Sequence, residues 1–192
     1  MRTVAGILLS AVLFTGLSAQ AGAQGPNQLV VQVATEPPGL DLVASPASAI
    51  AAVVHYNIQE GLVKVDRGGR IVPWLAERWH TSDNRNYTFF LKKGVRFHNG
   101  RELKAADVKF VIDRARNPET KHHQRARYEN ITDIIVKDDY TVTLALKELD
   151  ASFLLTLARQ GSVIYPRESA ETMKSEPVGT GPFRLAEWVR GD

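Results

Sequence analysis

The pattern of apolar and polar positions changes its period between residues 87 and 115. From Tyr87 to Leu91 every second side chain is apolar and aimed to one side, which predicts a strand with one buried face. The pair Asn99-Gly100 follows and predicts a tight turn with a positive φ angle. After the turn, apolar residues recur at the i, i+3, i+4 and i+7 spacing of a helix face, namely Val108, Val111, Ile112 and Ala115. A strand, a turn and a helix are therefore expected in direct succession.

Other alternating segments predict two hairpins, which pair residues 62–65 with 71–72 and residues 131–136 with 141–146. The β-branched run Leu29–Thr35 predicts a buried strand, and Gly179–Leu185 is expected to lead into a strand that ends near Trp188. Strands and helices mix without a strict βαβ rhythm. The fold class is therefore predicted as α/β or α+β with many antiparallel pairs.

Three shorter helical segments are expected. Ser48 is a candidate cap for a helix over residues 49–59, and Asp150 for a helix through residues 153–158. Pro73 is expected to open a short helical turn before Trp79.

Composition limits the size and the partners. The 192 residues are 44% apolar and 23% charged, which suits one globular domain of moderate size and part of a second. The net charge is +3, from 24 basic and 21 acidic side chains spread along the chain. Nucleic-acid binders concentrate their charge in a patch or stripe, so no nucleic-acid partner is expected.

Residues 1–23 are typical of a secretory signal peptide. Arg2 precedes an apolar segment from Val4 to Leu17, and small residues at 19–23 form overlapping cleavage sites. The alternative is an uncleaved membrane anchor, but the apolar segment falls short of the roughly 20 residues that cross a bilayer. The chain has no cysteine, which excludes disulfides, a thiol nucleophile and a lipid-anchored cysteine at the cleavage site. We expect a free periplasmic protein.

Candidate chemistry is sparse. Adjacent His122 and His123 lack the spacing of a metal site, so a solvated basic loop is the favoured interpretation. Pro182 and Phe183 follow the Gly179-Thr180-Gly181 turn, where a phosphate-binding loop would have a lysine and a hydroxyl residue. The glycines are expected to allow a sharp turn or a close approach to another segment. There is no Gly-x-Ser-x-Gly motif of a serine hydrolase.

Larger side chains also favour structural interpretations. A short basic cluster beside Tyr128 is interpreted as a solvated face and not as a nucleic-acid patch, and it contains Lys121, Arg125 and Arg127. His98, beside the Asn99-Gly100 turn, is expected at the surface. The three tryptophans are expected in core and hairpin packing, and they are Trp74, Trp79 and Trp188.

An ordered series of segments covers nearly all of the chain after residue 23. It comprises Glu36–Asp41, Glu60–Leu62, Pro73–Trp79, the block Tyr87–Val111, Gly179–Phe183 and Trp188. This series resembles the family 5 extracytoplasmic solute-binding proteins, which serve peptide and nickel ABC importers. One residue departs from the family pattern. Lys104 stands where the family usually has a helix-capping threonine, and Asp107 is expected to offset part of the lost cap, which is worth roughly 1 kcal/mol.

The resemblance implies a fold and a domain division. It implies the first lobe of a two-lobed, type II periplasmic-binding-protein-like fold, with a mixed sheet, antiparallel hairpins and the second lobe missing. Residues 24–48 would begin lobe I, residues 49–164 would form an inserted subdomain that contains the block 87–111, and residues 165–192 would return to lobe I and end there. Lobes of this kind close on a ligand by a hinge.

The resemblance also implies the function. The chain would capture a small solute, with a di- or oligopeptide favoured, and deliver it to an ABC import permease as a monomer, without catalysis, cofactor or metal. Nickel complexes, glutathione and opine- or sugar-like solutes remain open. The residues that would border the cleft are Ser45, Pro46, Gly179, Thr180 and Gly181. The alternatives are a secreted enzyme with an unrecognised site and a non-functional truncated fragment.

Overall fold

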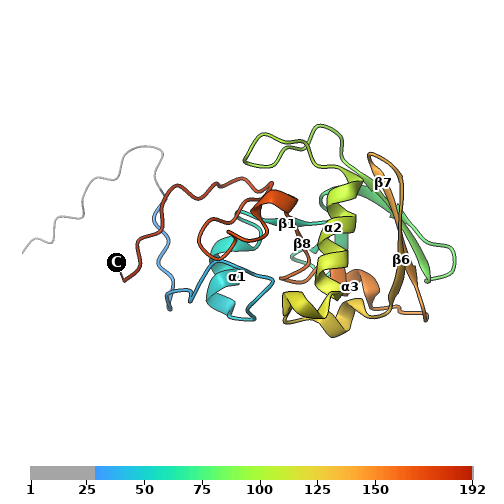
Figure 1. Ribbon diagram of the computed structural model, residues 1–192, viewed down its shortest axis with the longest axis horizontal. Coiled ribbons are helices and arrows are strands. Elements are labelled where there is room, and N and C mark those ends of the chain that lie inside the picture. The colour runs from blue at the N-terminus through green and yellow to red at the C-terminus, as the bar shows by residue number, and fades with distance from the viewer. Residues whose placement is uncertain (1–28, 192) are drawn as a thin grey trace, which may run out of the picture. The chain divides into compact units, whose positions relative to one another are not determined.

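The computed structural model describes residues 29–191, and those from Val33 onward form one compact unit (Figure 1). The predicted signal peptide lies outside the described residues. Within the described part, the largest sheet has four antiparallel strands in the order β4-β5-β7-β6. These strands are β4 Ala76–His80, β5 Asn86–Leu91, β7 Thr141–Leu146 and β6 Ile131–Asp138.

Helix α2 (Ala105–Arg116) covers one face of this sheet and contacts β6 and β7 (Figure 1). The predicted apolar stripe of α2 is buried against the sheet, as are the alternate side chains Tyr87, Phe89 and Leu91 of β5. Between them, Gly100 adopts the predicted positive φ angle of 88°. The succession of strand, turn and helix is confirmed, because both periodicities matched a single buried interface.

Smaller elements complete the unit. The pair β1 (Glu60–Gly61) and β8 (Val163–Ile164) joins segments about a hundred residues apart, and β2 (Val63–Val65) forms the predicted hairpin with β3 (Ile71–Pro73). Every strand pair in these sheets is antiparallel. The remaining helices are α1 Ser48–Val54, α3 Phe153–Leu157 and the 3₁₀ turns Pro118–Thr120, Arg125–Tyr128 and Arg167–Ser169.

Helix α2 begins without a hydroxyl cap, as its sequence predicts. The carboxylate of Asp107 accepts a 2.9 Å hydrogen bond from the backbone N–H of Lys104 and so satisfies that donor. Lys104 itself turns outward to Glu102 and Asp139. Asp107 thus compensates for the missing threonine from inside the helix.

Two expected helices are wrong in extent or kind. Helix α1 ends at Val54, not at residue 59, because Asn57 Nδ2 donates to the carbonyls of Ala52 and Val53 and closes the helix end. Ser48 makes no capping hydrogen bond and is the first residue of the helix. The expected helical turn after Pro73 is absent. Residues from Ala76 pair instead with β5, because a half-buried ladder outweighs a weak local helix preference.

Two expected strands are wrong. Residues 29–35 form no strand, and Leu29 is 78% exposed. No described segment pairs with these residues, and an unpaired strand leaves its backbone groups to water. The segment after Gly181 has no regular strand either. Leu185 and Trp188 are half-buried with two exposed residues between them, so the burial does not follow the two-residue period of a strand.

Candidate functional site

The turn at Gly179–Gly181 packs directly on the backbone of Asn57 and Ile58. The N–H of Gly181 donates to the Ile58 carbonyl at 2.9 Å, and the N–H of Phe183 donates to the Asn57 carbonyl at 3.0 Å. A Cβ atom on Gly179 or Gly181 would overlap these carbonyl groups. The predicted close approach is confirmed, and it explains why both positions are glycine.

His98 holds the same turn from the other side. Its backbone N–H donates to the Gly179 carbonyl at 2.9 Å, and its ring Nδ1 accepts from the Gly179 N–H at 3.4 Å. The ring proton therefore lies on Nε2, which donates to the Gly181 carbonyl at 2.9 Å. The expectation of a surface histidine is wrong, because His98 is half-buried as a bracket for the turn.

Thr180, at the tip of the turn, points its hydroxyl at a carboxylate. Its Oγ1 donates to Glu60 Oε2 at 2.7 Å. Glu60 belongs to β1 and also lines an open hollow of about 460 Å³, together with Tyr56, Lys64, Trp74 and Pro182. The turn is thus connected to a concave surface with two aromatic rings.

Ser45 and Pro46 lie at a different hollow. Ser45 is half-buried and its hydroxyl accepts from the Ala47 N–H at 3.3 Å. The adjoining hollow of about 230 Å³ is also lined by Asp41 and Lys174, and Pro46 accepts a 3.4 Å bond from Gln160. The described residues show no hydrogen bond and no shared pocket between this loop and the glycine turn. The five predicted residues therefore form two separate groups.

The aromatic hollow has no counterpart among the sequence predictions. Trp74 is buried, as expected of a packing residue, but its ring contacts Tyr56 at a centroid distance of 4.6 Å. Tyr56 has φ = 71°, a left-handed conformation that a tyrosine does not signal in a sequence. The only available signal was the concentration of aromatic residues in the segments His55-Tyr56 and Pro73-Trp74.

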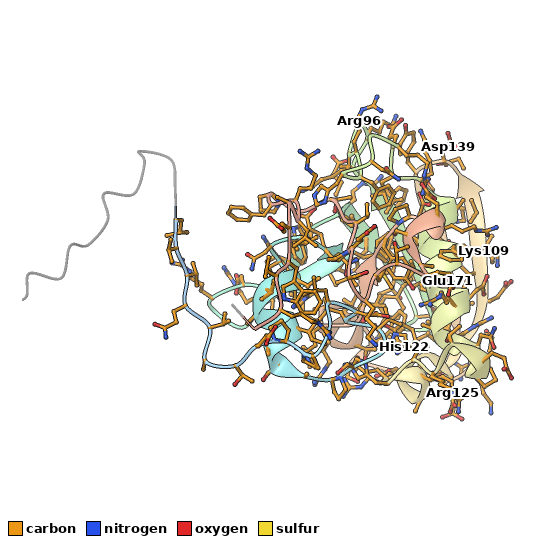
Figure 2. The ribbon with its side chains drawn as sticks, turned by 60° about the vertical axis from the view of Figure 1, so that its left-hand side comes forward. Arg96, Lys109, His122, Arg125, Asp139 and Glu171 are labelled. Atoms are coloured by element: carbon orange, nitrogen blue, oxygen red, sulfur yellow. The ribbon has the colours of Figure 1, made fainter. Side chains whose placement is uncertain are left out.

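The His122-His123 pair is not a solvated loop. His122 is 5% exposed and lies inside the body of the unit, whereas Arg125 lies at its rim (Figure 2). His122 Nδ1 accepts from the Gln124 N–H at 3.0 Å, and burial lowers its pKa from 6.5 to about 4. His123 Nδ1 donates to the Val43 carbonyl at 2.9 Å. Backbone groups satisfy both ring nitrogens of His122, which accounts for its burial, whereas Nε2 of His123 is buried without a hydrogen-bond partner among the described residues.

Two further features are absent from the described residues 29–191. No group of three or more metal-ligating side chains occurs there. No helix in this range combines the length and apolar character that a membrane crossing requires.

The profile described as bacterial extracellular solute-binding proteins, family 5, middle part, matches residues 70–192, more than half of the chain. The chain belongs to this family. The matched range contains the block 87–111 and the glycine turn, so the resemblance seen in those motifs is confirmed.

Two curated relatives extend the comparison with family 5. The chain is 32% identical over 148 residues to the glutathione-binding protein GsiB of Salmonella choleraesuis, covering 74% of this chain and 29% of the relative. It is 34% identical over 147 residues to the dipeptide-binding protein of Escherichia coli, covering 62% of this chain and 28% of the relative. The chain thus spans less than a third of the length of these relatives.

Solved structures agree on the fold. The PBP AgaA of A. tumefaciens R10, in complex with agropinic acid, shares 35% identity, with a TM-score of 0.76 over 81% of this chain and 32% of that chain. The ABC transporter-associated periplasmic binding protein DppA of Helicobacter pylori, in complex with the peptide STSA, shares 27% identity, with a TM-score of 0.72 over 82% of this chain and 36% of that chain. The α/β periplasmic-binding-protein fold is confirmed, and the extent of the match fits one lobe.

Proposed function

We propose that this family 5 protein captures a small solute in the periplasm, with a di- or oligopeptide favoured, and delivers it to an ABC import permease. One observation carries the proposal. Over 82% of its length the chain shares its fold with a periplasmic binding protein in complex with a four-residue peptide. The names of the relatives, which bind glutathione and dipeptides, favour the same class of solute. Its action is binding without catalysis, as a monomer.

The periplasmic location is supported by the sequence. Residues 1–23 have the pattern of a cleavable signal peptide, and no cysteine is available to carry a lipid anchor. The family description, extracellular solute-binding proteins, is consistent with export. We also propose the domain division at residues 24–48, 49–164 and 165–192 as parts of one lobe.

Five residues are proposed to border the cleft, namely Ser45, Pro46, Gly179, Thr180 and Gly181. Two features of the geometry support this role. The glycine turn is fixed on both sides by backbone bonds and by the His98 ring, so its tip is held in place before any ligand arrives. Each of the two groups lies next to a hollow of a size that can admit part of a small molecule.

Calorimetric titration with trialanine, dialanine and glutathione tests the proposal. Saturable binding by at least one of these peptides is expected, and mass spectrometry of the recovered solute should find it unmodified. Thr180→Val should weaken the binding because it removes the hydroxyl that fixes Glu60. Thr132→Val, on strand β6, is the matched control. A cleaved or otherwise altered peptide would favour the enzyme alternative, and no binding by any of the three would overturn the peptide assignment.

A further inference from the structure

The hollow beside the glycine turn has an aromatic floor and an aromatic wall. Trp74 forms the buried floor, and the ring of Tyr56 stands at 47° to it with 4.6 Å between centroids. The Tyr56 ring also stacks on His55 at 4.0 Å and 21°, and His55 in turn lies 6.2 Å from the Trp74 ring. Tyr56 is therefore held by two rings while 40% of its surface stays open to solvent. A rigid, partly exposed aromatic face is a ready stacking surface for a planar group.

The backbone at Tyr56 is strained. Its φ angle of 71° places a bulky residue in the left-handed region, where glycine and asparagine are the usual occupants. The N–H of Tyr56 donates to the Gln59 carbonyl at 3.1 Å, which fixes this turn after α1. An asparagine would satisfy the same turn at a lower conformational cost. A tyrosine in this place is better explained by what its ring does at the surface than by the fold.

The charges of the hollow favour an anion. Lys64 Nζ lies 5.1 Å from the centre of the Trp74 ring, and Arg67 also lines the hollow. Neither cation forms a salt bridge with any residue of the described part. Of the two carboxylates in the lining, Asp66 is already paired with Arg70 at 2.8 Å. Glu60 accepts from Thr180, so two unpaired cations face one carboxylate without a cationic partner.

We propose that this hollow binds a carboxylate joined to an aromatic or flat apolar group, with the ring on Tyr56 and the carboxylate at Lys64. The inference rests on the proposed function, because the carboxylate is that of the captured solute. The shared chemistry has two sources, the C-terminal aromatic residue of a peptide and a free aromatic acid. Glu60 lines the hollow and accepts a hydrogen bond from Thr180. The site therefore adjoins the turn that is proposed to border the cleft.

The indole N–H signal of Trp74 in a ¹H–¹⁵N spectrum of the chain reports on this hollow, and the spectrum of Trp74→Phe assigns it. N-acetylphenylalanine should shift the signal in a saturable manner. N-acetylphenylalanine amide lacks the carboxylate and N-acetylalanine lacks the ring, so each should bind about three- to tenfold more weakly. The dipeptide Ala-Phe and 3-phenylpropanoate distinguish the two sources, since a peptide site prefers the former and an aromatic-acid site the latter.

Variants separate the two contacts. Tyr56→Asn suits the left-handed backbone and removes the ring. It should therefore keep the fold and weaken the binding of N-acetylphenylalanine about three- to tenfold. Tyr56→Phe keeps the ring and should retain this binding. Lys64→Met should abolish the preference for the acid over the amide. Lys147→Met is the matched control at an exposed lysine. Equal binding of acid, amide and N-acetylalanine, or no response of Trp74, would overturn the inference. Trialanine binding without a Trp74 response would do so while leaving solute capture intact.

Discussion

Arg101 forms a bidentate ion pair with Asp107 through both terminal nitrogens of its guanidinium group. Nη2 donates to Oδ1 at 2.7 Å and Nη1 to Oδ2 at 3.1 Å, while the Asp107 side chain is only 7% exposed. The same carboxylate accepts from the Lys104 N–H at the start of α2. Asp107 therefore links Arg101, which follows the turn at Gly100, to the start of α2. It also accepts the hydrogen bond that a capping side chain would otherwise accept.

Replacement of this carboxylate should be costly. Asp107→Ala removes the two-pronged ion pair and leaves the Lys104 N–H without its partner, so we expect a loss of about 2–4 kcal/mol in the free energy of unfolding. Urea denaturation followed by circular dichroism measures it. Asp113→Ala is the matched control on the same helix, because Asp113 pairs with Lys109 and Arg116 at the surface and such pairs contribute about 0.3–0.5 kcal/mol each. Equal losses in both variants would contradict the role given to Asp107.

The close approach of the glycine turn leads to a second prediction. In Gly179→Ala the new methyl group would overlap the Ile58 carbonyl, and the turn must move away from the backbone of Ile58 and Gln59. We expect a loss of roughly 2–3 kcal/mol, the upper range for overpacking, together with loss of the Thr180–Glu60 hydrogen bond. Thermal denaturation and the chemical shifts of Glu60 report the two effects.

A control for this variant is Gly68→Ala. Gly68 lies in the β2–β3 turn, where a Cβ would meet side-chain atoms alone, Oδ1 of Asp66 at 3.3 Å and Nε of Arg70 at 3.8 Å. Its unfolding free energy should change by less than about 1 kcal/mol. A stable, unshifted Gly179→Ala protein would show that the backbone contact at Ile58 is not a constraint.

The sequence determined the parts of the fold in which one period matches one buried surface. Strand β5 and helix α2 fall in this class, since the alternation at Tyr87–Leu91 and the stripe beginning at Val108 are both buried as expected. The helical turn predicted after Pro73 was wrong because the pairing of residues from Ala76 with β5 is a tertiary contact, which no local pattern contains. The strand predicted from Leu29 was wrong because a strand needs a partner, and no described segment pairs with these residues.

The candidate site was less predictable than the fold. The sequence predicted either a sharp turn or a close approach at the two glycines, and the structure shows the close approach. The ring of His98 on the turn could not be foreseen, since its partners lie more than eighty residues away. The stacked face of Tyr56 depends on a left-handed backbone that the residue type disfavours. Such features arise from long-range packing and local strain, which a pattern of apolar positions does not encode.

Buried His122 and half-buried His55 should make stability fall in mild acid. Burial lowers the pKa of both His55 and His122 from 6.5 to about 4. Between these values the unfolded chain binds protons that the folded chain does not, so their stabilising contribution is present above pH 6.5 and is lost as the pH falls towards 4. Denaturation midpoints at half-unit pH steps should show this decline. The pKa values of Asp83 and Glu102 are held at about 2 by hydrogen bonds, so their effect begins only near pH 4 and below.

Substitution of the two histidines tests whether their rings cause the loss of stability in acid. His122→Asn retains an acceptor for the Gln124 N–H and removes the titrating ring, so the slope between pH 6.5 and 4 should become shallower. His55→Asn should act in the same direction, and the double variant should be nearly flat. An unchanged slope in the double variant would assign the acid sensitivity to other groups.

The buried pair Tyr128 and Ser162 should behave as one unit. The Ser162 hydroxyl donates to the Thr156 carbonyl at 2.8 Å, so its oxygen is left to accept the Tyr128 hydroxyl proton at 2.6 Å. Burial raises the pKa of Tyr128 to about 12, in keeping with a neutral donor that does not meet water.

A double-mutant cycle tests this chain of hydrogen bonds. Ser162→Ala strands a buried hydroxyl on Tyr128 and an unpaired Thr156 carbonyl, so we expect a loss of about 2–3 kcal/mol, whereas Tyr128→Phe should cost about 1 kcal/mol. Since removal of both hydroxyls strands no phenol, the double variant should lose less than the sum of the singles by about 1 kcal/mol. Chemical denaturation of the four proteins gives the coupling. Strict additivity would mean that the two hydroxyls are not coupled, and the hydrogen bond between Tyr128 and Ser162 would then contribute nothing to stability.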